Sequence, residues 1–182
     1  MSSTMTETEL LERYATGERD FRGANLSALD LREANLRGII LQGANLCDAI
    51  LLNTDLIDAD LSEADLSQAS LQKADLTQAN LEGAKLRKAD MREARLHGAK
   101  LRGANLAEVN LSSADLREAD LREVILCRAD LMQTGFLKAD LCGADLRGAD
   151  LFQVRLKEAY FDGKTQFDPG FEPSALGMQH LE

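Results

Sequence analysis

The chain has 182 residues, and its 31 Asp and Glu against 21 Lys and Arg give a formal net charge of −10 at pH 7. This acidity argues against general binding to nucleic acids or anionic membranes, which would require a basic surface. Tryptophan is absent and aromatic residues make up only 4% of the chain, so the core must be built mainly from Leu and Ala.

Residues 7–16 are predicted to form a short α-helix. Thr6, with Glu9 three residues later, makes a capping box, and Gly17 would end the helix. The helix has an apolar face suited to covering the first coil of the structure that follows, formed by Leu10, Leu11 and Tyr14. We therefore expect an N-terminal segment, residues 1–18, that acts as a cap.

From residue 21 to residue 161 the sequence repeats every five residues. The central residue of the repeat is Leu at 25 of 29 places, the exceptions being Phe21, Met91, Phe136 and Phe161. Ala stands two residues earlier at 21 of 28 places, and the other seven residues there are small or apolar. The residue between them is usually Asp or Asn. A fixed period over so much of the chain indicates a stacked repeat architecture.

A period of five suits neither a straight helix nor a straight strand. On an α-helix successive central residues would step by about 140° and would form no single stripe. In one long strand they would alternate between opposite faces. Both problems disappear if the chain turns a corner in every repeat, with the Ala and Leu positions pointing inward. The chain must then coil, and 9 of its 13 glycines fall two residues after the central position, where the corner is expected.

The repeat Ala-(Asp/Asn)-Leu-X-X resembles the consensus of the pentapeptide-repeat family, over residues 19–163. The resemblance implies an all-β fold, a right-handed quadrilateral parallel β-helix with four repeats per coil. With 29 repeats the rod would have about seven coils and a length of roughly 34 Å at the usual strand spacing. In that fold Thr134-Gly135-Phe136, the strongest departure from the consensus, is interpreted as a substitution in the core.

After Phe161 the repeat ends, and residues 164–182 form an irregular tail. Phe167 and Phe171 lie in a turn-rich stretch with two prolines, and a short helix is predicted from Ser174 to His180. The tail has two interpretations, a second cap or a homodimer contact of the kind that some relatives make at this end.

The sequence offers no catalytic, cofactor or metal site. It lacks a phosphate loop, zinc-ligand spacing and a nucleophile elbow, so we expect a protein that is not an enzyme and needs no cofactor. In a four-sided rod Cys47 and Cys127 would lie four coils apart and could not pair, and Cys142 would lie on a different face from Cys127. With no apolar run that could span a membrane and no signal-peptide stretch, these residues favour a reduced, cytoplasmic setting.

The charges are unevenly distributed along the repeats. A basic girdle falls within residues 85–102 and comprises Lys85, Arg87, Lys88, Arg92, Arg95, Lys100 and Arg102. An acidic patch falls within residues 38–72, which contain no Lys or Arg, and comprises Asp48, Asp55, Asp58, Asp60, Glu63 and Asp65. The two groups are either an ordinary solvated surface, a bipolar docking surface or an end-to-side contact between rods. Charge alone does not choose between these interpretations.

Two functions are compatible with such a rod. The first is a rigid scaffold for an unidentified protein partner, with no membrane association and no direct nucleic-acid binding. The alternative rests on the resemblance: the quinolone-resistance and mycobacterial fluoroquinolone-resistance members of the family are acidic rods that mimic DNA on DNA gyrase. The present chain shares their acidity, but its centres are mostly Leu where theirs are often Phe, and its basic girdle would interrupt a DNA-like track of negative charge.

Overall fold

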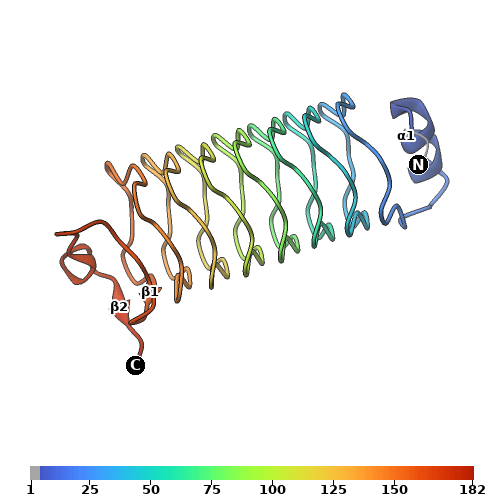
Figure 1. Cartoon of the computed structure of the whole chain (residues 1–182). Helices are drawn as coiled ribbons and strands as arrows, with labels where there is room; N and C mark the ends of the chain where they lie inside the picture. Colours follow the sequence, from blue (N-terminus) through green and yellow to red (C-terminus); the bar gives the residue numbers. More distant parts are fainter. Residues whose placement is uncertain (1–4) are drawn as a thin grey trace.

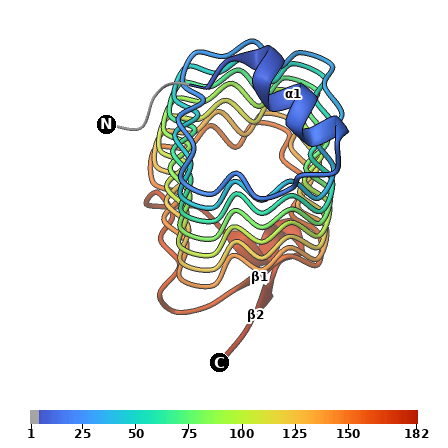
Figure 2. The same cartoon turned by 90° about the vertical axis from the view of Figure 1, so that its right-hand side faces the viewer.

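The computed structural model describes residues 5–182, which form one elongated rod of stacked coils (Figure 1). Parallel bridges join each residue directly before a central position to the residue twenty places later, from Asp20 with Ile40 to Asp140 with Tyr160. Twenty residues, or four pentapeptides, therefore make one turn. Seen from the N-terminal end in Figure 2, successive turns lie over one another. The expectation that the chain coils with four repeats per turn is confirmed by this pairing.

Each repeat bends at a four-residue turn. The N–H of the Ala position donates to the carbonyl of the central residue three places earlier, as in Ala84 to Leu81 at 3.0 Å. Every residue two places after a centre, from Gly23 to Glu158, has a positive φ between 54° and 72°. Type II turns require this left-handed conformation at their third residue, which explains why glycine gathers there.

The sides of each turn are too short for regular strands. Between two bends only one residue pairs with its neighbour, so the coils are joined by isolated parallel bridges. In the described residues, regular strands occur only at the C-terminal end, where β1 (Tyr160–Phe161) pairs in parallel with β2 (Gln179–His180). Around each bridge the backbone hydrogen bonds still reach both neighbouring turns. The N–H of Leu81 donates to the carbonyl of Lys100 on the next turn at 2.6 Å, and the N–H of Asn80 donates to that of Ala59 on the turn before at 2.9 Å.

The core is the stack of central residues with the Ala positions between them. All centres from Phe21 to Leu146, and Leu156 as well, are buried, while Leu151 and Phe161 are partly covered at the C-terminal end. Two polar residues occupy Ala positions: Thr54 and Thr134 donate their hydroxyls to the carbonyls of Leu31 and Leu111, each at 2.8 Å. Phe136 is completely buried, which confirms its interpretation as a core substitution.

Helix α1 (Glu7–Ala15) covers the N-terminal coil, as predicted, and ends one residue before the expected limit. Thr6 Oγ1 accepts the backbone N–H of Glu9 at 3.2 Å, and Gly17 takes a φ of 101° after the helix. Leu10 is fully buried and Tyr14 donates its hydroxyl to the carbonyl of Arg37 at 2.8 Å. Figure 2 shows α1 lying across this end of the rod, where it covers the edge of the first coil.

The prediction of a helix from Ser174 to His180 is wrong. The tail forms only the 3₁₀ helix η1 (Pro173–Leu176), and Gly177 then turns the chain with a φ of 79°. Residues 179 and 180 pair as β2 because the last coil leaves backbone acceptors at its edge. Gln179 donates to the carbonyl of Ala159 and Leu181 to that of Phe161, each at 2.8 Å. The edge hydrogen bonds outweigh the weak helical preference of this short segment.

Candidate interaction surface

The outward side chains are bound to their own backbone in a repeated local motif. The Asp or Asn before each centre accepts the backbone N–H two residues later, as in Asp65 with Ser67 at 3.1 Å. Where that later residue is Arg, its guanidinium also pairs with the same carboxylate. Six such Asp-Leu-Arg or Asp-Phe-Arg or Asp-Met-Arg pairs occur: Asp20–Arg22, Asp30–Arg32, Asp90–Arg92, Asp115–Arg117, Asp120–Arg122 and Asp145–Arg147.

These arginines keep the paired carboxylates ionised. Hydrogen bonds from Arg22 lower the pKa of Asp20 to about 2, and Arg147 likewise lowers the pKa of Asp145 below its ordinary range. The cation and the carboxylate neutralise each other at the surface. An arginine in this motif is therefore less available to a partner than the sequence suggests.

The basic girdle encircles the rod, because its residues span most of one twenty-residue turn, but its charge is largely compensated. Six of its seven cations form ion pairs with carboxylates of the same chain. They are Lys85 with Asp65, Arg87 and Lys88 with Glu108, Arg92 with Asp90, Arg95 with Asp75, and Arg102 with Glu123. Only Lys100 of this group has no ion pair among residues 5–182. A docking role for the girdle stays a prediction.

The acidic patch follows the rod around about one turn. Asp55 pairs with Arg37 at 3.5 Å, and Asp65 pairs with Lys85 at 3.7 Å. The other four carboxylates have no ion pair with any described residue, and they belong to Asp48, Asp58, Asp60 and Glu63. Asp60 accepts hydrogen bonds from Ser62 and Asn80 instead. The patch therefore keeps more uncompensated charge than the girdle, and its role as a docking surface stays a prediction.

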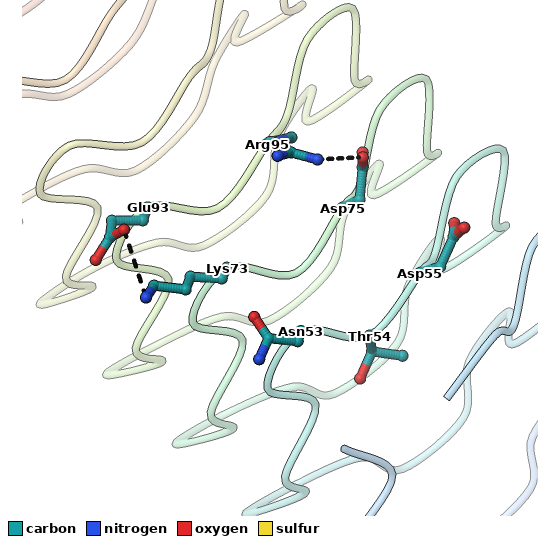
Figure 3. A pocket seen from close by; sticks show the side chains of 7 residues that line it. All are labelled: Asn53, Thr54, Asp55, Lys73, Asp75, Glu93 and Arg95. Carbon is teal, nitrogen blue, oxygen red and sulfur yellow. Dashed lines mark hydrogen bonds and ion pairs between the residues drawn. The ribbon is translucent and has the colours of Figure 1, made fainter. Parts of the chain in front are cut away.

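A shallow polar depression links the two groups. Asn53, Thr54, Asp55, Lys73, Asp75, Glu93 and Arg95 surround a volume of about 500 Å³ on successive turns (Figure 3). Lys73 pairs with Glu93 at 3.8 Å, and Arg95 Nη1 lies 3.3 Å from Asp75 Oδ2. The charges of this depression are satisfied within the rod, which leaves little to attract a ligand.

The C-terminal aromatic residues pack on the end of the rod. Phe167 stacks on Phe171 with ring centroids 4.7 Å apart, and Phe161 makes T-shaped contacts with the rings of Phe167 and His180. Both Phe167 and Phe171 are partly buried against the core. These contacts favour the cap interpretation of the two residues. Leu176 and Leu181 remain 45% and 42% exposed at the same end, and the homodimer contact stays a prediction.

The thiols are poor nucleophiles. All three cysteines are free and partly buried, and burial raises the pKa of Cys47 to about 11 and that of Cys142 to about 12. Few of these groups are thiolates at neutral pH, and the thiolate is the reactive form. Among residues 5–182, no three His, Cys, Asp or Glu side chains are close enough together to hold a metal ion. No helix of that range is both long and apolar enough to cross a membrane.

The model of the family described as pentapeptide repeats matches this chain in eight copies, which together extend from residue 20 to residue 163. The chain belongs to the pentapeptide-repeat family. Solved members of the family fold as right-handed β-helices, in agreement with the parallel coils described above.

Several solved pentapeptide-repeat proteins are similar to this one. HetL, involved in heterocyst differentiation regulation in the cyanobacterium Nostoc sp. strain PCC 7120, is 33% identical over 96% of this chain and 92% of its own, with a TM-score of 0.35. Rfr23 from the cyanobacterium Cyanothece 51142 is 26% identical over 88% and 99%, with a TM-score of 0.42. QnrB1, a plasmid-mediated fluoroquinolone resistance protein, is 15% identical over 90% and 92%, with a TM-score of 0.41. The chain has no match among curated proteins. The TM-scores are low, so membership of the family rests on the repeat sequence.

One feature of the pentapeptide-repeat surface was missed by the sequence analysis. A second depression, of about 530 Å³, lies over Gly135 and includes the exposed side chains of Leu137, Arg155 and Lys157. The sequence feature that could have indicated this depression is Gly135, which stands at a repeat position usually occupied by Asp or Asn. The repeat register would also have placed Arg155 next to it, twenty residues later.

Proposed function

We propose that this pentapeptide-repeat protein, a right-handed four-sided rod of about seven coils, is a non-enzymatic scaffold that presents its outer surface to a protein partner. The proposal rests mainly on the division between the inside and the outside of the coil. The central residues are almost all buried, and the variable residues of each repeat face outward on a backbone tied to both neighbouring turns. Such a framework suits the display of side chains at fixed spacing.

The scaffold is tested by affinity capture with the purified rod as bait, followed by cross-linking. The matched baits are a variant with Asp48→Asn, Asp58→Asn, Asp60→Asn and Glu63→Gln, and a variant with Leu176→Ser and Leu181→Ser. We expect one partner to be retained by the wild-type rod at a fixed ratio, and the two variants show whether it docks on the acidic patch or on the C-terminal end. If no protein is retained at a fixed ratio, the scaffold proposal fails.

A second candidate is a DNA-mimicking ligand of DNA gyrase. It is favoured by the charge compensation in the girdle, because ion pairs remove most of the positive charge that would interrupt an acidic track. The test is the supercoiling activity of gyrase during titration with the rod. Inhibition that is relieved by Asp55→Lys, Asp58→Lys, Asp60→Lys and Asp65→Lys together would support mimicry. Unchanged supercoiling, or inhibition that this variant retains, would contradict it.

A further inference from the structure

One column of residues runs along a side of the rod with a gap in it. The residues directly before the centres on this side stack at intervals of twenty, in the order Asn35, Asp55, Asp75, Arg95, Asp115, Gly135 and Arg155. Every member except Gly135 carries a polar or charged side chain. The position of Gly135 is therefore one where the column would normally place a hydrogen-bonding group.

The gap changes the environment of the arginine that follows it. Two arginines stand in this column, each one turn after a different neighbour. Arg95 follows Asp75 and pairs with its carboxylate at 3.3 Å, as Figure 3 shows. Arg155 follows Gly135, which has no side chain and so offers no carboxylate for an ion pair.

Arg155 has no other carboxylate among the described residues. Asp115, on the far side of the gap, is already occupied, since Arg117 donates to its two oxygens at 2.7 and 2.6 Å. The guanidinium of Arg155 makes one hydrogen bond, from Nη2 to the carbonyl of Gln133 at 3.1 Å. Most of its five donors therefore face solvent.

The missing side chain also leaves space. The depression of about 530 Å³ spans three turns: Gly135 and Leu137 lie on the middle turn and Arg155 and Lys157 on the next. The turn before contributes Ser113, Ala114 and the paired Asp115 and Arg117. Leu137 is 36% exposed, and Lys157 has no ion pair with any described residue. Two uncompensated cations thus stand beside apolar surface, on a protein whose net charge is −10.

We propose that this depression binds an acidic peptide segment of a partner protein. A carboxylate of the peptide takes the place of the absent Asp side chain and pairs with Arg155 and Lys157, and a neighbouring apolar side chain contacts Leu137. A carboxylate suits this position because Arg binds it through two parallel hydrogen bonds. This inference rests on the proposed scaffold function and specifies the chemistry of the partner.

Exposed apolar residues at the preceding corner of the same two turns favour a peptide over a small carboxylate. Met132 and Phe152, three residues before Gly135 and Arg155, do not line the depression, and they are 37% and 60% exposed. A chain of several residues can contact this apolar surface in addition to the cations, whereas a single small anion would leave it in water. Exposed apolar surface next to charged groups is a common feature of protein-binding sites.

The test uses a fluorescein-labelled peptide with a Leu between Asp and Glu residues, measured by fluorescence anisotropy with the full-length rod. A peptide of the same length with Asn and Gln in place of the acids and a labelled single-stranded oligonucleotide are the comparison probes. We expect binding of the acidic peptide alone. Equal binding of the neutral peptide, or preference for the oligonucleotide, would overturn the proposal.

The decisive variant is Gly135→Asp, which restores the usual residue of the repeat. A Cβ at Gly135 has its nearest neighbour at 3.7 Å and the backbone there is not left-handed, so the variant should fold. Its carboxylate should pair with Arg155 as Asp75 does with Arg95, and peptide affinity should fall about tenfold or more, which corresponds to the loss of one good charged contact. Arg155→Gln should weaken binding similarly, while Arg95→Gln, from the same column, should leave it unchanged.

The outcomes separate this inference from the scaffold function. Peptide binding that survives Gly135→Asp in a folded protein would overturn the site. If the peptide does not bind but the captured partner is still retained at a fixed ratio by both wild type and Gly135→Asp, the site fails and the scaffold stands. A partner that is lost on Gly135→Asp and Arg155→Gln, but not on Arg95→Gln, supports both.

Discussion

A Leu at the centre of a pentapeptide is buried among its neighbours along the rod, whereas the residue after it points to solvent. Leu81 is completely buried and Glu82 is exposed. We expect Leu81→Asp to destabilise the protein by several kcal/mol, about the cost of an unpaired charge in an apolar core. Glu82→Ser should change the free energy of unfolding by no more than about 0.5 kcal/mol. Thermal unfolding followed by circular dichroism measures both, and equal tolerance of the two changes would contradict the assignment of inside and outside.

The corner residue, two places after each centre from Phe21 to Leu156, must adopt a positive φ whatever its side chain. Gly103 has a φ of 67° and open space around it, so an added methyl group would meet no neighbour. Gly103→Ala should still destabilise the protein by about 1 kcal/mol, because an L-residue is strained in the left-handed region. Gly163 provides the matched control, since it also has open space but no positive φ. Denaturant unfolding should show a loss for Gly103→Ala and none for Gly163→Ala, and equal losses would show that the strain at the corner is negligible.

At the scale of an element, the repeated Asp-x-Arg pairs make the stability of the folded protein depend on pH in the acidic range. In each pair the Asp has a folded-state pKa below its unfolded value, and hydrogen bonds from Arg22 lower that of Asp20 to about 2. Their stabilising effect is therefore complete above about pH 4, near the unfolded pKa. It is lost as the pH falls through the lowered folded pKa.

We accordingly expect the Tm to fall between about pH 4 and pH 2, and to fall less steeply in a variant with Arg122→Gln and Arg147→Gln. Arg128→Gln is the control, because Arg128 has no ion pair with any described residue. A Tm profile in which the paired and the control variants cannot be distinguished would mean that these surface pairs do not shift the acid response.

The elements also show how far sequence reasoning extends. Helix α1 and the left-handed corners were predictable because their signals are local: Thr6 with Glu9, and glycine at one register position. The tail was not, because residues 179–180 form β2 only through the open edge of the preceding coil. The compensation of the girdle depends on residues about twenty positions away, such as Arg95 with Asp75. Gly135 was noticed but interpreted through its buried neighbour Phe136, and the depression over it became visible only with Arg155 in place.

At the scale of the whole molecule, the twenty-residue turn is the unit that can be removed. Each residue meets partners twenty positions away on either side, so deletion of residues 61–80 should leave every downstream residue on its original column. Asp60 would then pair with Lys100, and the central and Ala positions would remain inside. Because a solenoid is stabilised by contacts between neighbouring turns, the shortened rod should fold with a modestly lower Tm.

Deletion of residues 61–62 removes a tenth as many residues and should do far more damage. A shift of two places sets each later central Leu against an Ala position of the turn before, and each corner residue, such as Lys73, against a central position. Polar and charged corner residues would meet the Leu stack at the junction, and the turns that span the deletion could not pair in register. Circular dichroism and thermal unfolding compare the two deletions directly. A folded protein for the longer deletion and a poorly folded one for the shorter would establish that the register, and not the amount of buried surface, maintains the rod, and the reverse order would refute it.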